Sequence, residues 1–225
     1  PSATGWYSST VAVSFSGSDP LVSPTIPASG LQAVYWQLDS APTSTAAAMD
    51  VNVEGRHHLS YYARDNAGNQ ENTNELALNI DRTAPTVSLA ADRLPQASGW
   101  YTSSVTFTLA VADTLSGPEQ ASYRLNNGPW QYGSAVPPGF KFTIAEEGVY
   151  TIEYGGRDAA GNNATTGITV ARIDGQAPKT AYLIEGTQGS NGWFVSPLTV
   201  KLVPADNGAG VQSTYYRVNN GAWQT

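Results

Sequence analysis

The feature that most constrains this 225-residue chain is an internal repeat of about 93 residues. An aromatic triplet, Gly-Trp-Tyr or Gly-Trp-Phe, begins at Gly5, Gly99 and Gly192. A second motif, Tyr-Arg-(Leu/Val)-Asn-Asn-Gly-x-Trp, begins at Tyr123 and Tyr216. A fixed period of this length indicates that the chain folds as a series of similar units.

Each aromatic triplet leads into a stretch in which apolar and polar residues alternate, around Val13, Leu109 and Val200. A period of two with β-branched residues is typical of a strand with one buried face. The Asn-Gly pair of the second motif, Asn127-Gly128 in one copy, predicts a tight hairpin in which both turn residues adopt positive φ. No stretch keeps a 3.6-residue period long enough for a stable helix, the Ala-rich residues 45–49 included.

These strand and turn signals predict an all-β fold of tandem immunoglobulin-like antiparallel β-sandwiches. We expect repeat 1 at residues 1–83, repeat 2 at residues 84–176 and repeat 3 at residues 177–225. Ala-Pro pairs at the two boundaries are expected to act as short, stiff joints. Repeat 1 is expected to lack its first strand and repeat 3 its second half. The segment is therefore expected to be part of a longer repetitive chain, or to be completed by strands of another subunit.

Composition excludes several classes of function. The net charge of −7 argues against nucleic acid or an anionic membrane surface as a partner, because both bind basic patches. The absence of cysteine excludes disulfides, thiolate nucleophiles and Cys-ligated zinc. No apolar run approaches the roughly 20 residues that span a bilayer, so we expect no membrane insertion of this segment.

The order of motifs resembles that of bacterial Ig-like repeats: Tyr-Arg-Leu-Asn-Asn-Gly-x-Trp, Glu-Gly, Arg-Asp-x-Ala-Gly-Asn and Ala-Pro. The resemblance covers the whole chain, although repeat 1 has Trp36 near the usual Arg and a longer first loop. Such repeats occur in large secreted or surface-anchored proteins and beside the catalytic domains of extracellular glycoside hydrolases. The resemblance implies an extracellular or cell-surface location and a spacer, stalk, adhesive or carbohydrate-associated role.

Aspartates recur in two kinds of loop. Asp65 and Asp158 each begin an Asp-x-Ala-Gly-Asn segment. An EF-type calcium loop carries carboxylates at several alternating positions and ends in a bidentate Glu, which these segments lack. We therefore expect hairpin turns in which Asp caps backbone N–H groups and Gly68 or Gly161 adopts the left-handed conformation.

The second kind of loop begins at Asp113 and Asp206, with Asp19 as a looser counterpart in repeat 1. Near a boundary, such loops could share a cation with the linker residues Asp81 or Asp174. The sequence shows no clustering of carboxylates, which favours solvated turns. We assign no metal site and no cofactor, and leave open whether Ca²⁺ stiffens the joints.

Five of the six tryptophans occupy repeat-equivalent positions, which indicates packing roles. Trp36, beside Tyr35, has no tryptophan counterpart and lies in a divergent hairpin. An exposed aromatic pair can stack on a sugar ring, so Tyr35 and Trp36 are the candidate ligand contacts.

We predict no catalytic residues. The adjacent residues His57 and His58 point to opposite faces of a strand, so they do not converge on one ion. No carboxylate pair of the kind that glycosidases hold in a cleft is evident. The lysines do not recur at one position in each unit, which gives no support to a repeated Lys–Asn isopeptide bond.

These observations predict a non-enzymatic, extracellular structural segment of a larger bacterial surface protein, forming a stalk, fibre or filament, with adhesion as a further role. The alternative is a carbohydrate-binding or spacer module of a secreted glycoside hydrolase. Expected partners are neighbouring copies or further repeats of the same chain, and a glycan or a host or cell-surface protein.

Overall fold

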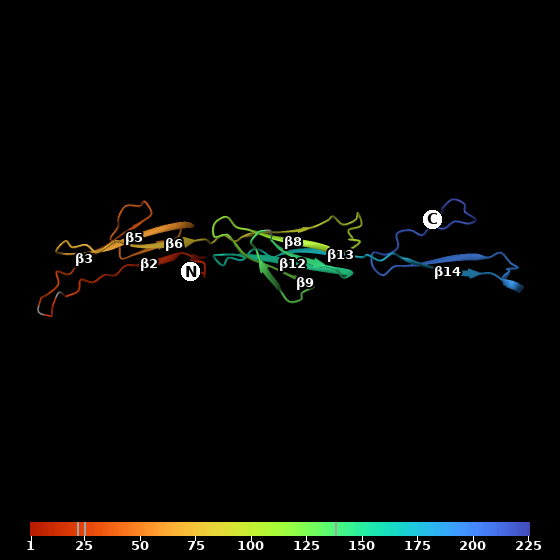
Figure 1. The fold of residues 1–225 in the computed structure, drawn as a ribbon, viewed down its shortest axis with the longest axis horizontal. Coiled ribbons are helices and arrows are strands. Elements are labelled where there is room, and N and C mark those ends of the chain that lie inside the picture. The colour runs from red at the N-terminus through yellow and green to blue at the C-terminus, as the bar shows by residue number, and fades with distance from the viewer. Residues whose placement is uncertain (22, 25, 138) are drawn as a thin grey trace.

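The computed structural model describes residues 1–225 except residues 22, 25 and 138. The three repeats follow one another along the longest axis of the molecule (Figure 1). Within the described residues, regular structure consists of β-strands and one short 3₁₀ turn, η1 (Ser190–Gly192). None of the described helical segments is long and apolar enough to cross a membrane.

Repeat 2 is a two-layered antiparallel β-sandwich. One layer has the strand order β11-β8-β7 and the other the order β10-β9-β12-β13. The strands are β7 (Thr86–Ala91), β8 (Val105–Ala112), β9 (Pro118–Leu125), β10 (Gln131–Ser134), β11 (Phe140–Ile144), β12 (Gly148–Asp158) and β13 (Gly167–Ile173). The predicted fold class is confirmed, and the seven strands agree with the number of strand signals in the sequence.

The core of repeat 2 lies between these two layers. In β8, alternate residues from Val105 to Val111 are buried, as the period of two predicts. Val105 and Phe107 pack with β11 and with Ile152 and Ile173 of the other layer, whereas Leu109 and Val111 pack with Ala121 of β9. The Tyr-Arg motif contributes from β9, where Tyr123 stacks on Phe142 with ring centroids 3.7 Å apart.

Repeat 1 has the same architecture with fewer strands. A four-stranded sheet of order β1-β6-β5-β3 faces the pair β2-β4. Its strands are β1 (Trp6–Tyr7), β2 (Val11–Ser14), β3 (Leu31–Leu38), β4 (Ala48–Val51), β5 (Gly55–Asp65) and β6 (Asn74–Ile80). Strand β1 pairs in parallel with β6, and no described strand of repeat 1 corresponds to β7.

Repeat 3 contains one paired sheet, formed by β14 (Lys179–Glu185) and β15 (Thr199–Ala205). Its register matches that of β7 and β8, because Tyr182 pairs with Leu202 as Leu89 pairs with Leu109, 93 residues earlier. Leu109 is fully buried, whereas Tyr182, Ile184 and Val200 are exposed. Among the described residues, no second layer covers the strand pair of repeat 3 as one covers β7 and β8 in repeat 2.

The predicted hairpin is present, but its positive-φ residues are one position earlier than expected. Asn126 and Asn127 have φ values of 50° and 58°, and Gly128 N–H closes the turn on Leu125 C=O at 2.8 Å. The expectation for the Asn-Gly pair was wrong because asparagine itself adopts the left-handed region readily. Gly128 is needed for space instead, since a Cβ there would lie 2.9 Å from the Leu125 oxygen.

The repeated tryptophans are not equally packed. Trp6 is 5% exposed, whereas Trp193, at the equivalent position of repeat 3, is 77% exposed. After the hairpins, Arg124 lies over Trp130 at 5.0 Å and Arg217 over Trp223 at 4.9 Å, which explains why Arg and Trp recur together. The predicted packing role holds for Trp6 and does not hold for the exposed tryptophans of repeat 3.

Candidate functional site at the joints between repeats

The joint between repeats 1 and 2, called joint 1, is organised by the linker residue Asp81. Its backbone N–H donates to Tyr7 C=O at 2.9 Å, which ties the linker to repeat 1. Its fully buried carboxylate accepts from Thr83 N–H at 3.0 Å and from Ser116 N–H of repeat 2 at 3.0 Å. One side chain thus fixes the linker and connects it to the following repeat.

The turn at residues 158–162 of repeat 2 also enters joint 1. Asn162 donates through Nδ2 to Asp81 C=O at 2.9 Å and to Thr83 C=O at 3.3 Å. On the other side, Ala159 C=O accepts from Ser2 Oγ at 2.8 Å and Thr4 Oγ1 at 2.6 Å. The turn is therefore held between the linker and the first residues of repeat 1.

The turn itself forms as the sequence predicts. Asp158 accepts through Oδ1 from Gly161 N–H at 2.8 Å and Asn162 N–H at 2.9 Å, and Gly161 has φ of 98°. Its counterpart Asp65 accepts from Asn69 N–H at 2.8 Å, and Gly68 has φ of 94°. The two turns differ in where they lie. Asp158 is fully buried in joint 1, whereas the turn of Asp65, which follows β5, lies at the end of repeat 1 that is away from joint 1 (Figure 1).

Joint 1 brings three carboxylates together. One side-chain oxygen of each of Asp81, Asp113 and Asp158 lies within 4.8 Å of the others. The expectation that carboxylates do not cluster was wrong, because the linker, a loop and a turn far apart in sequence meet at this point. Carboxylate oxygens are the ligands that Ca²⁺ prefers, so these three residues form a set that could hold a divalent cation.

Backbone N–H groups already surround this cluster. Asp113 accepts through Oδ1 from Leu115 N–H at 3.0 Å and Gly117 N–H at 2.8 Å, in the same manner as Asp158 and Asp81. Among the described residues, no Lys or Arg side chain forms an ion pair with any of the three. Backbone dipoles therefore provide the compensation for these carboxylates that ion pairs would otherwise give.

A fourth carboxylate, which sequence reasoning missed, anchors the linker. Glu54 accepts from Arg82 N–H at 2.7 Å and from Thr83 Oγ1 at 3.0 Å. Its counterpart Glu147 accepts from Gly175 N–H at 3.3 Å and from Gln176 Nε2 at 2.9 Å. The recurrence of Glu-Gly at the repeat spacing was the signal that could have identified these residues.

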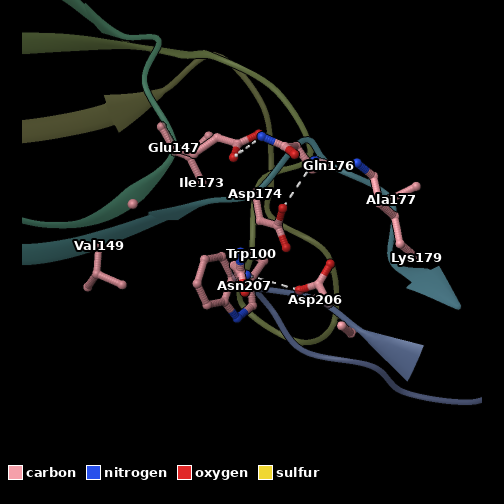
Figure 2. A pocket seen from close by; sticks show the side chains of 13 residues that line it. Trp100, Glu147, Val149, Ile173, Asp174, Gln176, Ala177, Lys179, Asp206 and Asn207 are labelled. Atoms are coloured by element: carbon pink, nitrogen blue, oxygen red, sulfur yellow. Dashed lines mark hydrogen bonds between the residues drawn. The ribbon is translucent and has the colours of Figure 1, made fainter. Parts of the chain in front are cut away.

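The joint between repeats 2 and 3, called joint 2, repeats the linker contacts. Asp174 accepts from Gln176 N–H at 3.1 Å and from Ala209 N–H of repeat 3 at 2.5 Å. Asp206 accepts from Gly208 N–H at 3.0 Å and Gly210 N–H at 2.8 Å, as Asp113 does in joint 1. Figure 2 shows Asp174, Asp206 and Glu147 around this linker.

Joint 2 contains an open cavity of about 630 Å³. Trp100, Glu147, Asp174 and Asp206 lie around it (Figure 2). The described residues of repeat 3 contain no counterpart of the turn at residues 158–162, which fills joint 1. Each of the three carboxylates accepts backbone N–H groups, which indicates a role in holding the chain.

The candidate ligand contacts Tyr35 and Trp36 lie on opposite faces of β3. Trp36 stacks on Phe15 with centroids 5.3 Å apart, and its Nε1 donates to Ala46 C=O at 2.8 Å. Tyr35 stacks on Tyr62 with centroids 5.2 Å apart. The two rings therefore do not form one flat surface, and ligand contact by either residue stays a prediction.

His57 and His58 also have separate partners. His57 Nδ1 lies 2.8 Å from Asp39 Oδ2 and its Nε2 lies 2.9 Å from Val53 C=O, whereas His58 Nε2 lies 2.6 Å from Glu75 Oε2. The hydrogen bond to Asp39 raises the pKa of His57, and the same bond lowers the pKa of Asp39. Because both ring nitrogens of His57 face acceptors, the protonated form is the one that fits.

The loop of Asp19 is the counterpart of the loops at Asp113 and Asp206, as expected. Asp19 accepts from Gly30 N–H at 2.9 Å, and Gly30 C=O accepts from Asn66 N–H at 2.9 Å. In repeat 2, Gly117 C=O accepts from Ala159 N–H at the same distance. The additional residues of repeat 1 therefore lie between Asp19 and Gly30.

Comparisons with known proteins add little to this description. No family model matches the sequence, and no curated protein matches it. Among solved structures, the fibronectin(III)-like modules of Clostridium thermocellum CbhA match with a TM-score of 0.39 and 13% identity, over 75% of this chain and 87% of that one. The D00–D0 domain of intimin matches with a TM-score of 0.34 and 16% identity, over 75% of this chain and 95% of that one. The assignment of the β-sandwich fold rests on the strand pairing itself.

Proposed function

We propose that this chain is a non-enzymatic structural segment of a larger extracellular bacterial protein, in which Ig-like repeats joined end to end form a stalk or fibre. Such a segment acts through its length and its resistance to bending. Each repeat contributes its own core, and the joints decide how far neighbouring repeats can rotate.

The observation that supports this proposal is the hydrogen bonding across joint 1. Ser116 N–H, Asn162 Nδ2 and Ala159 C=O of repeat 2 each bond a residue of repeat 1 or of the linker. Pro85, in the linker, is buried. A flexible linker would leave these groups in water, so the contacts favour a fixed angle between the two repeats.

The angle between repeats 1 and 2 can be tested with two spin labels. The chain has no cysteine, so Asn72→Cys and Thr165→Cys, both at exposed positions, provide one label in each repeat. Pulsed electron paramagnetic resonance is expected to give one narrow distance distribution. A broad distribution in the otherwise unaltered chain would contradict a stiff stalk.

A matched pair of variants separates stiffness from folding. Asn162→Ala removes the bonds to the linker and is expected to broaden the distribution. Asn69→Ala makes the equivalent change in the outer turn of repeat 1, where Asn69 Nδ2 bonds only Asp65 among the described contacts, and is expected to leave it narrow. Equal broadening by both variants would show that the linker contacts do not set the angle.

A further inference from the structure

We propose that joint 2 and the exposed face of β14 and β15 form a docking site for the second half of an Ig-like unit. The occupant is a polypeptide segment of the same chemistry as residues 133–176: strands followed by an Arg-Asp-x-Ala-Gly-Asn turn and a returning strand. The inference rests on the proposed function for its setting and deepens it by naming the partner of repeat 3.

The two joints have equivalent contacts on the linker side. Asp174 bonds Gln176 N–H and Ala209 N–H, just as Asp81 bonds Thr83 N–H and Ser116 N–H 93 residues earlier. The preceding tight turn also recurs, because Gln96 N–H bonds Trp100 C=O as Ser2 N–H bonds Trp6 C=O. Joint 2 thus has the contacts of joint 1 on the linker side.

Joint 2 also has room for a further turn. In joint 1, the turn at residues 158–162 lies among Asp81, Asp113 and the hydroxyls of Ser2 and Thr4. In joint 2, the equivalent positions are Asp174, Asp206, Gln96 and Ser98, and a cavity of about 630 Å³ opens beside the two carboxylates (Figure 2). In joint 1 the turn donates through Asn162 Nδ2 to the carbonyls of Asp81 and Thr83, and the counterparts of these two residues, Asp174 and Gln176, line the cavity of joint 2.

The described part of repeat 3 has an exposed apolar face. In repeat 2, the inward face of β7 and β8 is covered by the other layer, through β9, β12 and β13. In repeat 3 the strands keep the same register, yet Tyr182, Ile184 and Val200 are 67%, 45% and 51% exposed. Contiguous apolar surface of this kind marks an interaction site. Of this cover, β12 and β13 belong to the segment that we assign as occupant, and β9 corresponds to residues 211–218 of repeat 3 itself.

The loops exclude a second copy of this chain as the occupant. Its free turn, at residues 65–69, already bonds its own loop, through Asn66 N–H to Gly30 C=O. In joint 2, the loop at Asp206–Gly210 holds the equivalent place beside the turn. A turn that brings its own loop would collide with this one, so the occupant must be a half-unit without that loop.

The test joins a copy of residues 133–176 directly after Thr225 in the full chain. Thr225 is equivalent to Tyr132, so this junction continues the repeat in register. Hydrogen exchange followed by mass spectrometry is expected to show ~100-fold slower exchange of the β14 and β15 amides than in the unmodified chain. Unchanged exchange, with repeat 2 still protected, would overturn the proposal.

Control fusions test the turn itself. When the appended copies of Asp158 and Asn162 are both alanine, protection of β14 and β15 is expected to fall by ~10-fold or more, and a scrambled segment should give none. Full protection despite the alanines would show that joint 2 does not bind the turn. Concentration-dependent protection and dimerisation of the unmodified chain would show that a second copy is the occupant, and would overturn the assignment.

The same fusion keeps the two proposals distinguishable. The distance distribution between repeats 1 and 2 reports on joint 1 alone, whereas the exchange of β14 and β15 reports on joint 2. A narrow distance distribution across joint 1 together with unprotected β14 and β15 would support the stalk and overturn the docking site. A broad distribution across joint 1 together with protected β14 and β15 would overturn the stiff stalk and support the docking site.

Discussion

Repeats 2 and 3 contain the same strand pair in the same register, but they surround it differently. In repeat 2 the pair β7 and β8 packs against a second sheet, and Leu109 is fully buried. In repeat 3 the described residues add no second sheet to the pair β14 and β15, and most of the apolar residues of the pair are exposed. Local sequence therefore determines the pairing of the strands, whereas the opposite layer determines whether that pairing is stable.

The largest expected difference between the two repeats follows from a core substitution. Leu109→Ala removes a fully buried side chain and is expected to destabilise repeat 2 by about 2–5 kcal/mol. Leu202→Ala, the equivalent change in repeat 3, is expected to cost less than about 1 kcal/mol, because the residue is only partly buried. Urea unfolding with amide exchange in β8 and β15 measures both, and equal costs would contradict the comparison.

The next largest expected loss of stability comes from a substitution in joint 1. Asn162→Ala removes a side chain that bonds Asp81 C=O, Thr83 C=O and Asp158, and is expected to cost about 1–3 kcal/mol. Asn69→Ala, in the free turn of repeat 1, is expected to cost about 0.5–1.5 kcal/mol. Thermal unfolding of the two variants compares them directly, and a larger loss from Asn69→Ala would refute the special role of the joint.

The hairpin turns give a smaller effect. Asn127→Ala places a residue that disfavours the left-handed region at φ of 58° and is expected to destabilise repeat 2 by about 1 kcal/mol. Asn220→Ala makes the same change in repeat 3, where the stability of the chain should scarcely respond. Asn127→Gly serves as the control, since glycine adopts this conformation without strain.

The smallest expected effect is a pH dependence confined to repeat 1. The raised pKa of His57 means that its bond to Asp39 stabilises the fold fully below the ordinary pKa of 6.5 and is lost as the pH rises through the raised value. The lowered pKa of Asp39 means that the same stabilisation is also lost in acid, as the pH falls below the ordinary value of 3.8. Repeat 1 should therefore melt at a higher temperature near pH 5.5 than near pH 8.5.

The control for this pH dependence is His57→Tyr. Tyrosine occupies the equivalent position in repeat 2, where Tyr150 Oη donates to Glu146 C=O at 3.1 Å as His57 Nε2 contacts Val53 C=O in repeat 1. The variant should keep this bond and lose the dependence between pH 5.5 and 8.5. A dependence that persists in the variant would show that His57 is not its source.

Much of the fold could be predicted from alternation and turn residues alone. The strands around Val13 and Leu109 lie where the period of two placed them, and the turns at Asp65 and Asp158 have the expected capping and positive-φ glycines. The position of the left-handed residues in the hairpin was wrong by one, because Asn126 and Asn127 compete with Gly128 for that conformation. These are local properties, which neighbouring residues decide.

The candidate site was only partly predictable. Asp81, Asp113 and Asp158 were each noticed in the sequence, but they are separated by tens of residues and no local pattern says that they meet. The same holds for Ser2 and Thr4, whose hydroxyls bond a turn more than 150 residues away. Repetition of Glu-Gly and of the aspartates indicated that they matter, without indicating what they contact.

The sequence by itself therefore determined the period, the strands, the turns and the all-β class, because each depends on residues a few positions apart. Only the tertiary structure decided that the turn of repeat 2 enters joint 1, that three carboxylates meet there, and that the equivalent place in joint 2 is open. Those contacts depend on how one repeat is placed on the next, which is set by long-range packing and hydrogen bonding that no short stretch of sequence encodes.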